Sequence, residues 1–258
     1  MRIGIRERRR LIGAAASVAL ATVAAIGMST GHAPIASAKS IGISAEYLET
    51  ATTNAAPARA AAVRTVSGKR SDLLNLQHPR VDRWVRAFTT DQRRSFATYL
   101  DRKDRYDDMI LAKLARRSMP ASLVYLPMIE SGYNPRARSP VKASGMWQFM
   151  TATAKRFGLK VNRRVDERAN PARSTDAALK YLDYLYDRFG SWYLAAAAYN
   201  GGEGRVSKAL KQVTGRTRGT DADFYRISHR LPQETRDYVP KLIAAARIGN
   251  NPRKYGFD

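Results

Sequence analysis

The chain has 258 residues, enough for one main domain with an extension, and its hydrophobic content of 44% can supply a core. It contains no cysteine, which excludes disulfides, thiolate chemistry and lipid attachment to a cysteine, and its three histidines are too scattered to predict a metal site or a catalytic triad. The formal net charge of +23 predicts a polyanionic partner or surface, with nucleic acid, anionic lipid and acidic polymers as candidates.

The N-terminal segment, residues 1–38, has the parts of a secretory signal peptide. An arginine-rich start precedes an alanine-rich apolar run over residues 11–28, and Ala36-Ser37-Ala38 has the small-x-small form of a cleavage site. An uncleaved membrane anchor is the alternative, because the apolar run is close to the shortest length that spans a bilayer. Export, which we expect on these grounds, argues against a nucleic-acid partner.

Residues 39–77 form a second segment, rich in alanine, threonine, serine and arginine, and their weak apolar periodicity predicts a flexible linker. From residue 78 onward, apolar residues recur at helical spacing, beginning with Val81 and Phe88. No segment shows sustained β alternation. We therefore predict an all-α domain over residues 78–258, built from several short to medium helices.

The expected helices follow from apolar periodicity and from start and stop signals. They cover residues 81–88, 90–100, 109–117, 120–130, 151–158, 174–190, 191–199, 204–212 and 231–249. The N-caps that we expect are Thr90-Asp91, Thr151 and Ser174. The expected stops include Gly158, Gly190 and Gly249, and residues 161–171 and 212–223 are expected to be loops.

Glu130 is the candidate general acid. It closes an apolar run that begins at Leu123, and the Ser131-Gly132 pair and Asn134-Pro135 behind it predict a helix stop and a turn. Apolar neighbours disfavour the charged form of a carboxyl group and raise its pKa, so such a residue can hold a proton near neutral pH. A solvated glutamate at a helix end is the alternative from this stretch alone.

Three stretches place a polar side chain where an apolar element meets a glycine-rich turn: residues 130–132, 145–149 and 198–202. Each can project a hydrogen-bonding group into a shared cleft, and the glycines would allow the backbone to approach a ligand closely. The amides of Gln148 and Asn200 suit the hydroxyl and acetamido groups of sugars.

Other residues near these turns also have structural explanations. Trp147 suits an ordinary core, and Tyr199 followed by Asn200 suits a buried tyrosine with a C-cap. Glu234 and Tyr238 are four residues apart on the last helix and therefore face the same way. A carboxylate in the first turn, as at Glu234, also complements the helix dipole.

Together these motifs resemble one family, the bacterial lytic transglycosylases of family 1, which have a soluble lytic transglycosylase domain and a goose-type lysozyme-like fold. Within it, the membrane-bound lytic murein transglycosylase D type looks most similar. The matching motifs are Glu130-Ser131, Gly145-Met146-Trp147-Gln148-Phe149, Ala198-Tyr199-Asn200-Gly201-Gly202 and Glu234-Thr235-Arg236-Asp237-Tyr238-Val239. Each motif is weak alone, but four in the family's order are specific, and the resemblance covers about residues 78–250.

The resemblance implies a one-acid mechanism on peptidoglycan. Glu130 would protonate the oxygen of the β-1,4 bond between N-acetylmuramic acid and N-acetylglucosamine, then take the proton of the C6 hydroxyl, whose oxygen closes on C1 as a 1,6-anhydro end. No metal or other cofactor is implied. The implied substrate-binding residues are Ser131, Gly145, Met146, Gln148, Tyr199, Asn200, Glu234 and Tyr238. Tyr199 and the substrate's acetamido group would stabilise the charge at C1, and Ser131 would orient Glu130 or the sugar.

The chain departs from this family type in two respects: it has no cysteine to carry a lipid after the signal peptide, and no LysM wall-binding repeat after the catalytic domain. We therefore expect an exported protein of the periplasm or cell envelope, not anchored through a cysteine lipid. Its expected partners are peptidoglycan glycan strands, with peripheral association of its basic surface with anionic wall or membrane.

Two other functions remain open at this point. A hydrolytic muramidase on the same fold would let water reach C1 instead of the C6 hydroxyl. A non-catalytic peptidoglycan-binding or scaffolding protein would bind the wall without releasing products, although Glu130 argues against it. The motifs do not distinguish exo- from endo-cleavage, and they indicate no oligomeric state.

Overall fold

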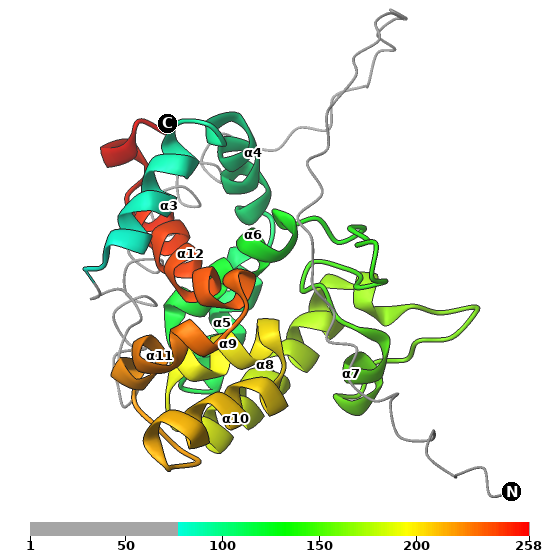
Figure 1. Ribbon diagram of the computed structural model, residues 1–258. Helices are drawn as coiled ribbons and strands as arrows, with labels where there is room; N and C mark the ends of the chain where they lie inside the picture. The colour runs from blue at the N-terminus through cyan, green and yellow to red at the C-terminus, as the bar shows by residue number, and fades with distance from the viewer. Residues whose placement is uncertain (1–76, 258) are drawn as a thin grey trace, which may run out of the picture.

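The computed structural model describes residues 77–257, and within this range the chain is helical and contains no strand (Figure 1). The all-α fold class is therefore confirmed. The expected signal peptide over 1–38 and all of the expected linker over 39–77 except Gln77 lie outside the described residues. Within residues 77–257, no helix combines the length and the apolar character that crossing a bilayer requires.

The α-helices are α3 (Pro79–Thr89), α4 (Arg93–Lys103), α5 (Asp107–Arg116), α6 (Leu126–Ser131), α7 (Thr151–Arg156), α8 (Pro171–Phe189), α9 (Trp192–Gly201), α10 (Glu203–Thr214), α11 (Asp221–Ile227) and α12 (Gln233–Asn250). Short 3-10 helices are η2 (Ala121–Tyr125), η3 (Glu167–Ala169), η4 (Ser228–Arg230) and η5 (Pro252–Tyr255).

Helices α9 and α12 form the centre of the fold (Figure 1). Helix α12 packs against α3 and α9, and α9 also packs against α8, α10 and α11. Every residue of α9 from Trp192 to Ala198 is buried, and its alanines allow the surrounding helices to approach closely. This packing fixes the end of α9, which carries the third motif, and the start of α12, which carries the fourth.

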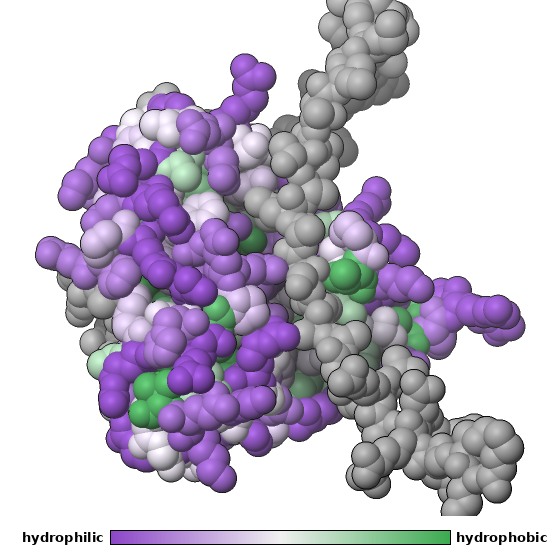
Figure 2. Space-filling model, in the orientation of Figure 1, coloured by the Kyte–Doolittle hydropathy of each residue, from purple (hydrophilic) through white to green (hydrophobic). Residues whose placement is uncertain are grey.

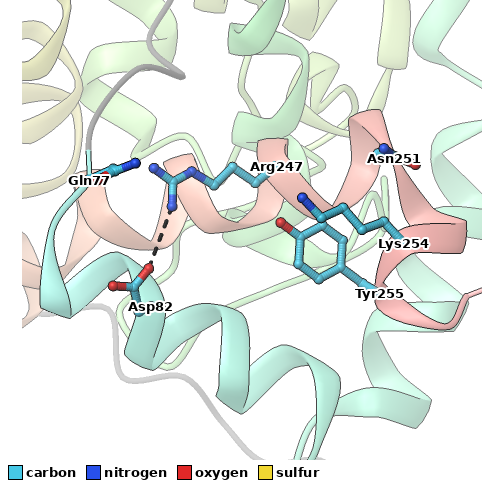
Figure 3. A pocket seen from close by; sticks show the side chains of 6 residues that line it. All are labelled: Gln77, Asp82, Arg247, Asn251, Lys254 and Tyr255. Atoms are coloured by element: carbon cyan, nitrogen blue, oxygen red, sulfur yellow. Dashed lines mark ion pairs between the residues drawn. The ribbon is translucent and has the colours of Figure 1, made fainter.

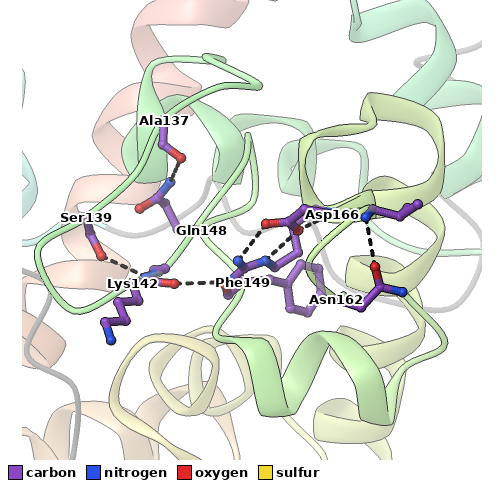
Figure 4. A network of polar contacts seen from close by, with 10 residues as sticks. Ala137, Ser139, Lys142, Gln148, Phe149, Asn162 and Asp166 are labelled. Carbon is purple, nitrogen blue, oxygen red and sulfur yellow. Dashed lines mark hydrogen bonds and ion pairs between the residues drawn. The ribbon is translucent and has the colours of Figure 1, made fainter. Parts of the chain in front are cut away.

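Residues 132–170 form a loop-rich lobe that connects α6 to α8 and lies beside the helices in Figure 1. Arg168 is buried in this lobe and binds both carboxylate oxygens of Asp166. It also donates to the carbonyl oxygens of Lys142 and Phe149, each at 3.0 Å (Figure 4). A buried guanidinium with this many acceptors fixes the lobe without a large hydrophobic core.

The three expected N-caps are wrong. Helix α8 begins at Pro171, because the side chain of Asn170 caps it by accepting a hydrogen bond from the Arg173 amide, and Ser174 lies inside the helix. Thr90 follows α3 and donates to a carbonyl of its last turn, so the residue that precedes α4 is Gln92. The residue that precedes α7 is Met150 rather than Thr151.

The expected loop over residues 212–223 is too long at both ends: residues 215–220 form the connection, whereas α10 continues to Thr214 and α11 begins at Asp221. Thr220 and Asp223 form a capping box that begins α11. Gly249 does not stop the last helix, which continues to Asn250. A Cβ at Gly249 would lie 2.2 Å from the ring of Tyr125, so this glycine permits close packing instead.

Candidate active site

Glu130 lies at the C-terminal end of α6, which continues directly from η2. The run predicted as one helix from residue 120 is thus a 3-10 helix followed by an α-helix. Residues 126–129 are buried, and Gly132 ends the helix in the left-handed region at φ +57°. A Cβ at Gly132 would lie 2.2 Å from the ring of Tyr99, so the turn after Glu130 requires a glycine. The carboxyl group is thereby held at the edge of the core.

Tyr238 of α12 brings the fourth motif to Glu130. Its hydroxyl donates a hydrogen bond of 2.5 Å to Oε1 of Glu130, across 108 residues of sequence. Burial, and after it the charge of Glu130, raises the pKa of Tyr238 well above its ordinary value. The phenol therefore remains protonated and acts as a permanent donor to the carboxyl group.

Burial raises the pKa of Glu130 from 4.5 to about 7. The hydrogen bond from Tyr238 and the charge of Lys241 both favour the carboxylate and lower the pKa, whereas the charge of Glu234 raises it. Burial outweighs the two opposing effects. A carboxyl group with this pKa is present in both its acid and base forms near neutral pH, as an acid–base catalyst requires.

Tyr199 supplies a second phenol at the C-terminal end of α9. Its hydroxyl donates a hydrogen bond of 2.8 Å to the carbonyl oxygen of Trp147, and this bond joins the third motif to the second. Burial, and after it the charge of Glu130, raises the pKa of Tyr199 well above its ordinary value. Tyr199 therefore stays neutral and within electrostatic reach of the carboxyl group.

Asn200 and Glu234 contact one another directly. The side-chain amide of Asn200 donates to Oε1 of Glu234 at 3.2 Å, and its oxygen accepts from the Thr235 hydroxyl at 2.9 Å. A Cβ at Gly201 would lie 2.6 Å from that hydroxyl oxygen. These contacts make the end of α9 and the start of α12 one rigid unit.

Ser131 connects the first motif to the second. Its hydroxyl donates to the carbonyl oxygen of Met146 at 2.8 Å and accepts from the Asn134 amide at 3.2 Å. The side chain of Met146 is fully buried in the core, beside Trp147. Ser131 and Met146 were expected to bind the substrate. Their contacts in the structure hold the 145–149 segment in place.

Gly145 and Gln148 form a tight turn in the lobe, and Figure 4 shows the side chain of Gln148 directed toward Ala137. Both residues lie in the left-handed region, with φ at +83° and +47°. Gln148 Nε2 donates to the carbonyl oxygen of Gly145 at 2.8 Å. A Cβ at Gly145 would lie 1.9 Å from the carbonyl oxygen of Arg168, so glycine is required here by the protein's own backbone.

Lys241 is a site residue that the motifs did not reveal. It lies three residues after Tyr238 on α12, and its Nζ lies 5.1 Å from the ring centroid of Trp84. Burial lowers its pKa, and the charges of Glu130, Glu234 and nearby Asp237 act in the opposite direction. Its helical spacing from Tyr238 and Glu234 is the sequence signal that could have identified it.

A cavity of about 420 Å³ lies elsewhere, between α3 and the C-terminal end of α12 (Figure 3). Its lining residues are Gln77, Asp82, Arg247, Asn251, Lys254 and Tyr255. None of these residues belongs to the four motifs. The groups around Glu130 therefore form a site separate from this cavity.

The groups around Glu130 are suited to proton transfer and to binding polar, uncharged groups. They are a carboxyl group, two phenols, the amide of Asn200, a second carboxylate and an ammonium group. The side chain of Gln148 contacts carbonyl oxygens of its own lobe. Across residues 77–257, histidine, aspartate and glutamate side chains form no group of three or more that could hold a metal ion.

Comparison with known proteins identifies the domain. Residues 108–221 match the family model of the Transglycosylase SLT domain. The chain is 43% identical over 156 residues to membrane-bound lytic murein transglycosylase D of Escherichia coli strain K12, covering 60% of this chain and 34% of that protein. It is 32% identical over 146 residues to the soluble lytic murein transglycosylase of the same strain, covering 54% of this chain and 22% of that protein. The chain thus spans about a third of the first relative's length.

A similar solved structure is the 70 kDa soluble lytic transglycosylase from Escherichia coli. It shares 24% sequence identity with the chain, with a TM-score of 0.49, over 81% of this chain and 34% of that chain.

Proposed function

We propose that this chain, which belongs to the lytic transglycosylase family, cleaves the β-1,4 bond between N-acetylmuramic acid and N-acetylglucosamine in peptidoglycan and leaves a 1,6-anhydro end. The observation that carries this proposal is the environment of Glu130, where burial raises the carboxyl pKa to about 7 and Tyr238 donates a 2.5 Å hydrogen bond to it. That environment suits one group that acts as acid and then as base.

In the first step, neutral Glu130 acts as a general acid. Because Tyr238 donates to Oε1, the proton of the neutral acid belongs on Oε2. Oε2 transfers this proton to the glycosidic oxygen while the bond between that oxygen and C1 breaks. General acid assistance of this kind contributes roughly 10²–10⁴-fold to a rate.

In the second step, Glu130 acts as a general base. The carboxylate takes the proton of the C6 hydroxyl of the muramic acid, and the C6 oxygen forms a bond to C1. The hydrogen bond from Tyr238 stabilises the carboxylate between the two steps. Glu130 ends the cycle protonated, so the reaction consumes no water and releases no net proton.

Positive charge develops at C1 between these steps and requires a nearby electron-rich group. Tyr199 suits this role because its hydrogen atom is directed to the carbonyl oxygen of Trp147, which leaves the lone pairs of its oxygen for another contact. The acetamido group of the substrate is the second candidate.

Substrate binding would fall to polar groups of the second, third and fourth motifs. Asn200, Glu234 and Gln148 offer amide and carboxylate groups to sugar hydroxyls, acetamido groups or peptide stems. In this proposal Gly145, Met146 and Ser131 act through the shape of the 145–149 segment, since Ser131 and Met146 are joined by a hydrogen bond. Tyr238 contributes through Glu130.

The rest of the chain fits an enzyme of the cell envelope. We assign residues 1–38 to a signal peptide, 39–77 to a linker and 78–258 to the catalytic domain. The face of the molecule in Figure 2 is predominantly hydrophilic, and the chain carries a net charge of +23. Such a surface suits peripheral association with anionic polymers of the wall or with a membrane surface.

The mass of the products tests the reaction type. Purified sacculi are digested with the protein, and the released muropeptides are analysed by mass spectrometry. We expect anhydro-muropeptides. Products that are one water heavier would identify a hydrolytic muramidase, and binding without release would identify a non-catalytic wall protein; either result would overturn the proposal.

A further inference from the structure

We propose that Lys241 is a positioning residue for the reaction, whose ammonium group stabilises the carboxylate form of Glu130 and so supports the step in which Glu130 accepts a proton. This inference rests on the proposed function for its place in catalysis. The effect of the Lys241 charge on Glu130 depends only on the arrangement of groups around α12.

The first support is the face that Lys241 occupies. Glu234, Tyr238 and Lys241 are spaced by four and then three residues on α12, so they lie along one side of the helix. Tyr238 donates to Glu130, and Glu234 accepts from the Asn200 amide. Lys241 thus lies on the same face as two groups that the motifs already assign to the site.

The second support is the balance of charge around Lys241. Three carboxyl groups act on it: Glu130 from α6, and Glu234 and Asp237 from its own helix. Asp237 is already bound by Arg83 at 2.8 Å and lies 3.6 Å from Arg80, both from α3. The charge of Lys241 is therefore balanced mainly by Glu130 and Glu234.

The third support is the way in which Lys241 is held. Its Nζ lies 5.1 Å from the ring centroid of Trp84 on α3, and a cation over an aromatic face is stabilised more strongly when it is desolvated. Among residues 77–257, Lys241 forms no direct ion pair with a carboxylate. The aromatic contact keeps the ammonium group near Glu130 without a direct bond to it.

This separation suits a residue that must be both acid and base. A direct ion pair would hold Glu130 ionised and remove its acid form. A cation at longer range lowers the free energy of the carboxylate while the surrounding apolar groups still permit protonation. In agreement with this arrangement, the charge of Lys241 lowers the pKa of Glu130 and the charge of Glu234 raises it.

The titration of Glu130 tests the inference without any turnover. The carboxyl band of Glu130 is followed by infrared difference spectroscopy across a pH series, with Glu130→Gln spectra to assign the band. In Lys241→Met, we expect the midpoint to rise by about one pH unit, because the ionised form loses a nearby cation. In the matched control Lys241→Arg, the midpoint should stay near that of the wild type, and in Glu234→Gln it should fall.

An unchanged midpoint in folded Lys241→Met would overturn the inference. Lys241→Gln, which is also neutral but polar, provides the same measurement if the methionine variant does not fold. The pH dependence of kcat is the second readout, since its alkaline limb should move upward with the midpoint. A shifted midpoint in a protein that releases no products would refute the proposed function and still confirm the electrostatic action of Lys241 on Glu130.

Discussion

At the scale of single residues, the state of Glu130 is decided by a competition in which burial is the largest effect. A hydrogen-bond donor and a nearby cation would ordinarily keep a glutamate ionised. Here the apolar end of α6 outweighs both, and the pKa rises to about 7. The same competition affects the stability of the protein, because the folded state then binds a proton more tightly than the unfolded state.

Glu130→Gln should therefore change how stability depends on pH. In the wild type, the contribution of Glu130 to the free energy of unfolding is largest below pH 4.5 and falls as pH rises from 4.5 to about 7. The variant lacks this fall. The difference in the free energy of unfolding between variant and wild type should therefore shift by about 3 kcal/mol in favour of the variant between acidic pH and about pH 8. Urea denaturation across this range measures the difference.

Glu203→Gln provides a control with the opposite sign. Burial raises the pKa of Glu203, but the hydrogen bonds from Tyr184 and Arg156 and the charges of Arg156 and Arg188 together lower the pKa overall. Its stabilising contribution is therefore present above the unfolded pKa and is lost as pH falls. A Glu130→Gln variant whose stability has the same pH dependence as that of the wild type would contradict the raised pKa.

The burial of Glu130 and the rise in its pKa were predictable from the sequence, because both depend on neighbours along the chain. Its partners were not predictable in the same way. Tyr238 is 108 residues distant, and the i, i+4 rule relates it only to Glu234. Lys241 belongs to no motif, and only the packing of α12 beside α6 and α3 shows that it lies near Glu130.

At the scale of helices and turns, three of the motif glycines have a structural role that the sequence did not predict. The sequence predicted that they let the backbone approach a ligand. In the structure, a Cβ at Gly132, Gly145 or Gly201 would instead collide with the protein itself, at 2.2, 1.9 and 2.6 Å. Their first function is to permit the turns and contacts that hold the motif side chains.

Gly145→Ala should therefore destabilise the fold severely. The substitution combines a left-handed backbone at φ +83° with a Cβ 1.9 Å from the Arg168 carbonyl oxygen, so we expect a loss of about 3 kcal/mol or more. Gly158→Ala is the matched control, since φ is +97° and nothing lies within 4 Å of its Cβ; it should lose about 1 kcal/mol. Equal losses in thermal or urea denaturation would show that the collision is relieved by movement of the lobe.

Most helices were predictable because apolar periodicity continues through them, whereas their caps were not. Asn170 caps α8 one turn before Ser174, and both residue types are good caps, so local preference could not choose between them. Helix α11 is short, and its capping box lies in a stretch rich in glycine and threonine that also resembles a loop. Tertiary contacts decide such cases.

At the scale of the whole molecule, the net charge of +23 predicts attraction to anionic polymers that weakens with salt. The Glu130→Gln variant, which should not digest the wall, allows binding to be measured alone. We expect the fraction bound to sacculi to fall about tenfold as ionic strength rises from about 0.05 to 0.5 M. Binding that does not change with salt would show that surface charge has no role in wall association.

The proposed reaction depends on Glu130 as the group that transfers the proton. The most direct measurement is the digestion of purified sacculi by wild-type protein and by Glu130→Gln at equal concentration, after both are shown to be folded. We expect anhydro-muropeptides from the wild type and a rate at least about 10²-fold lower from the variant. Anhydro-muropeptides released by the variant at the wild-type rate would contradict the proposed role of Glu130.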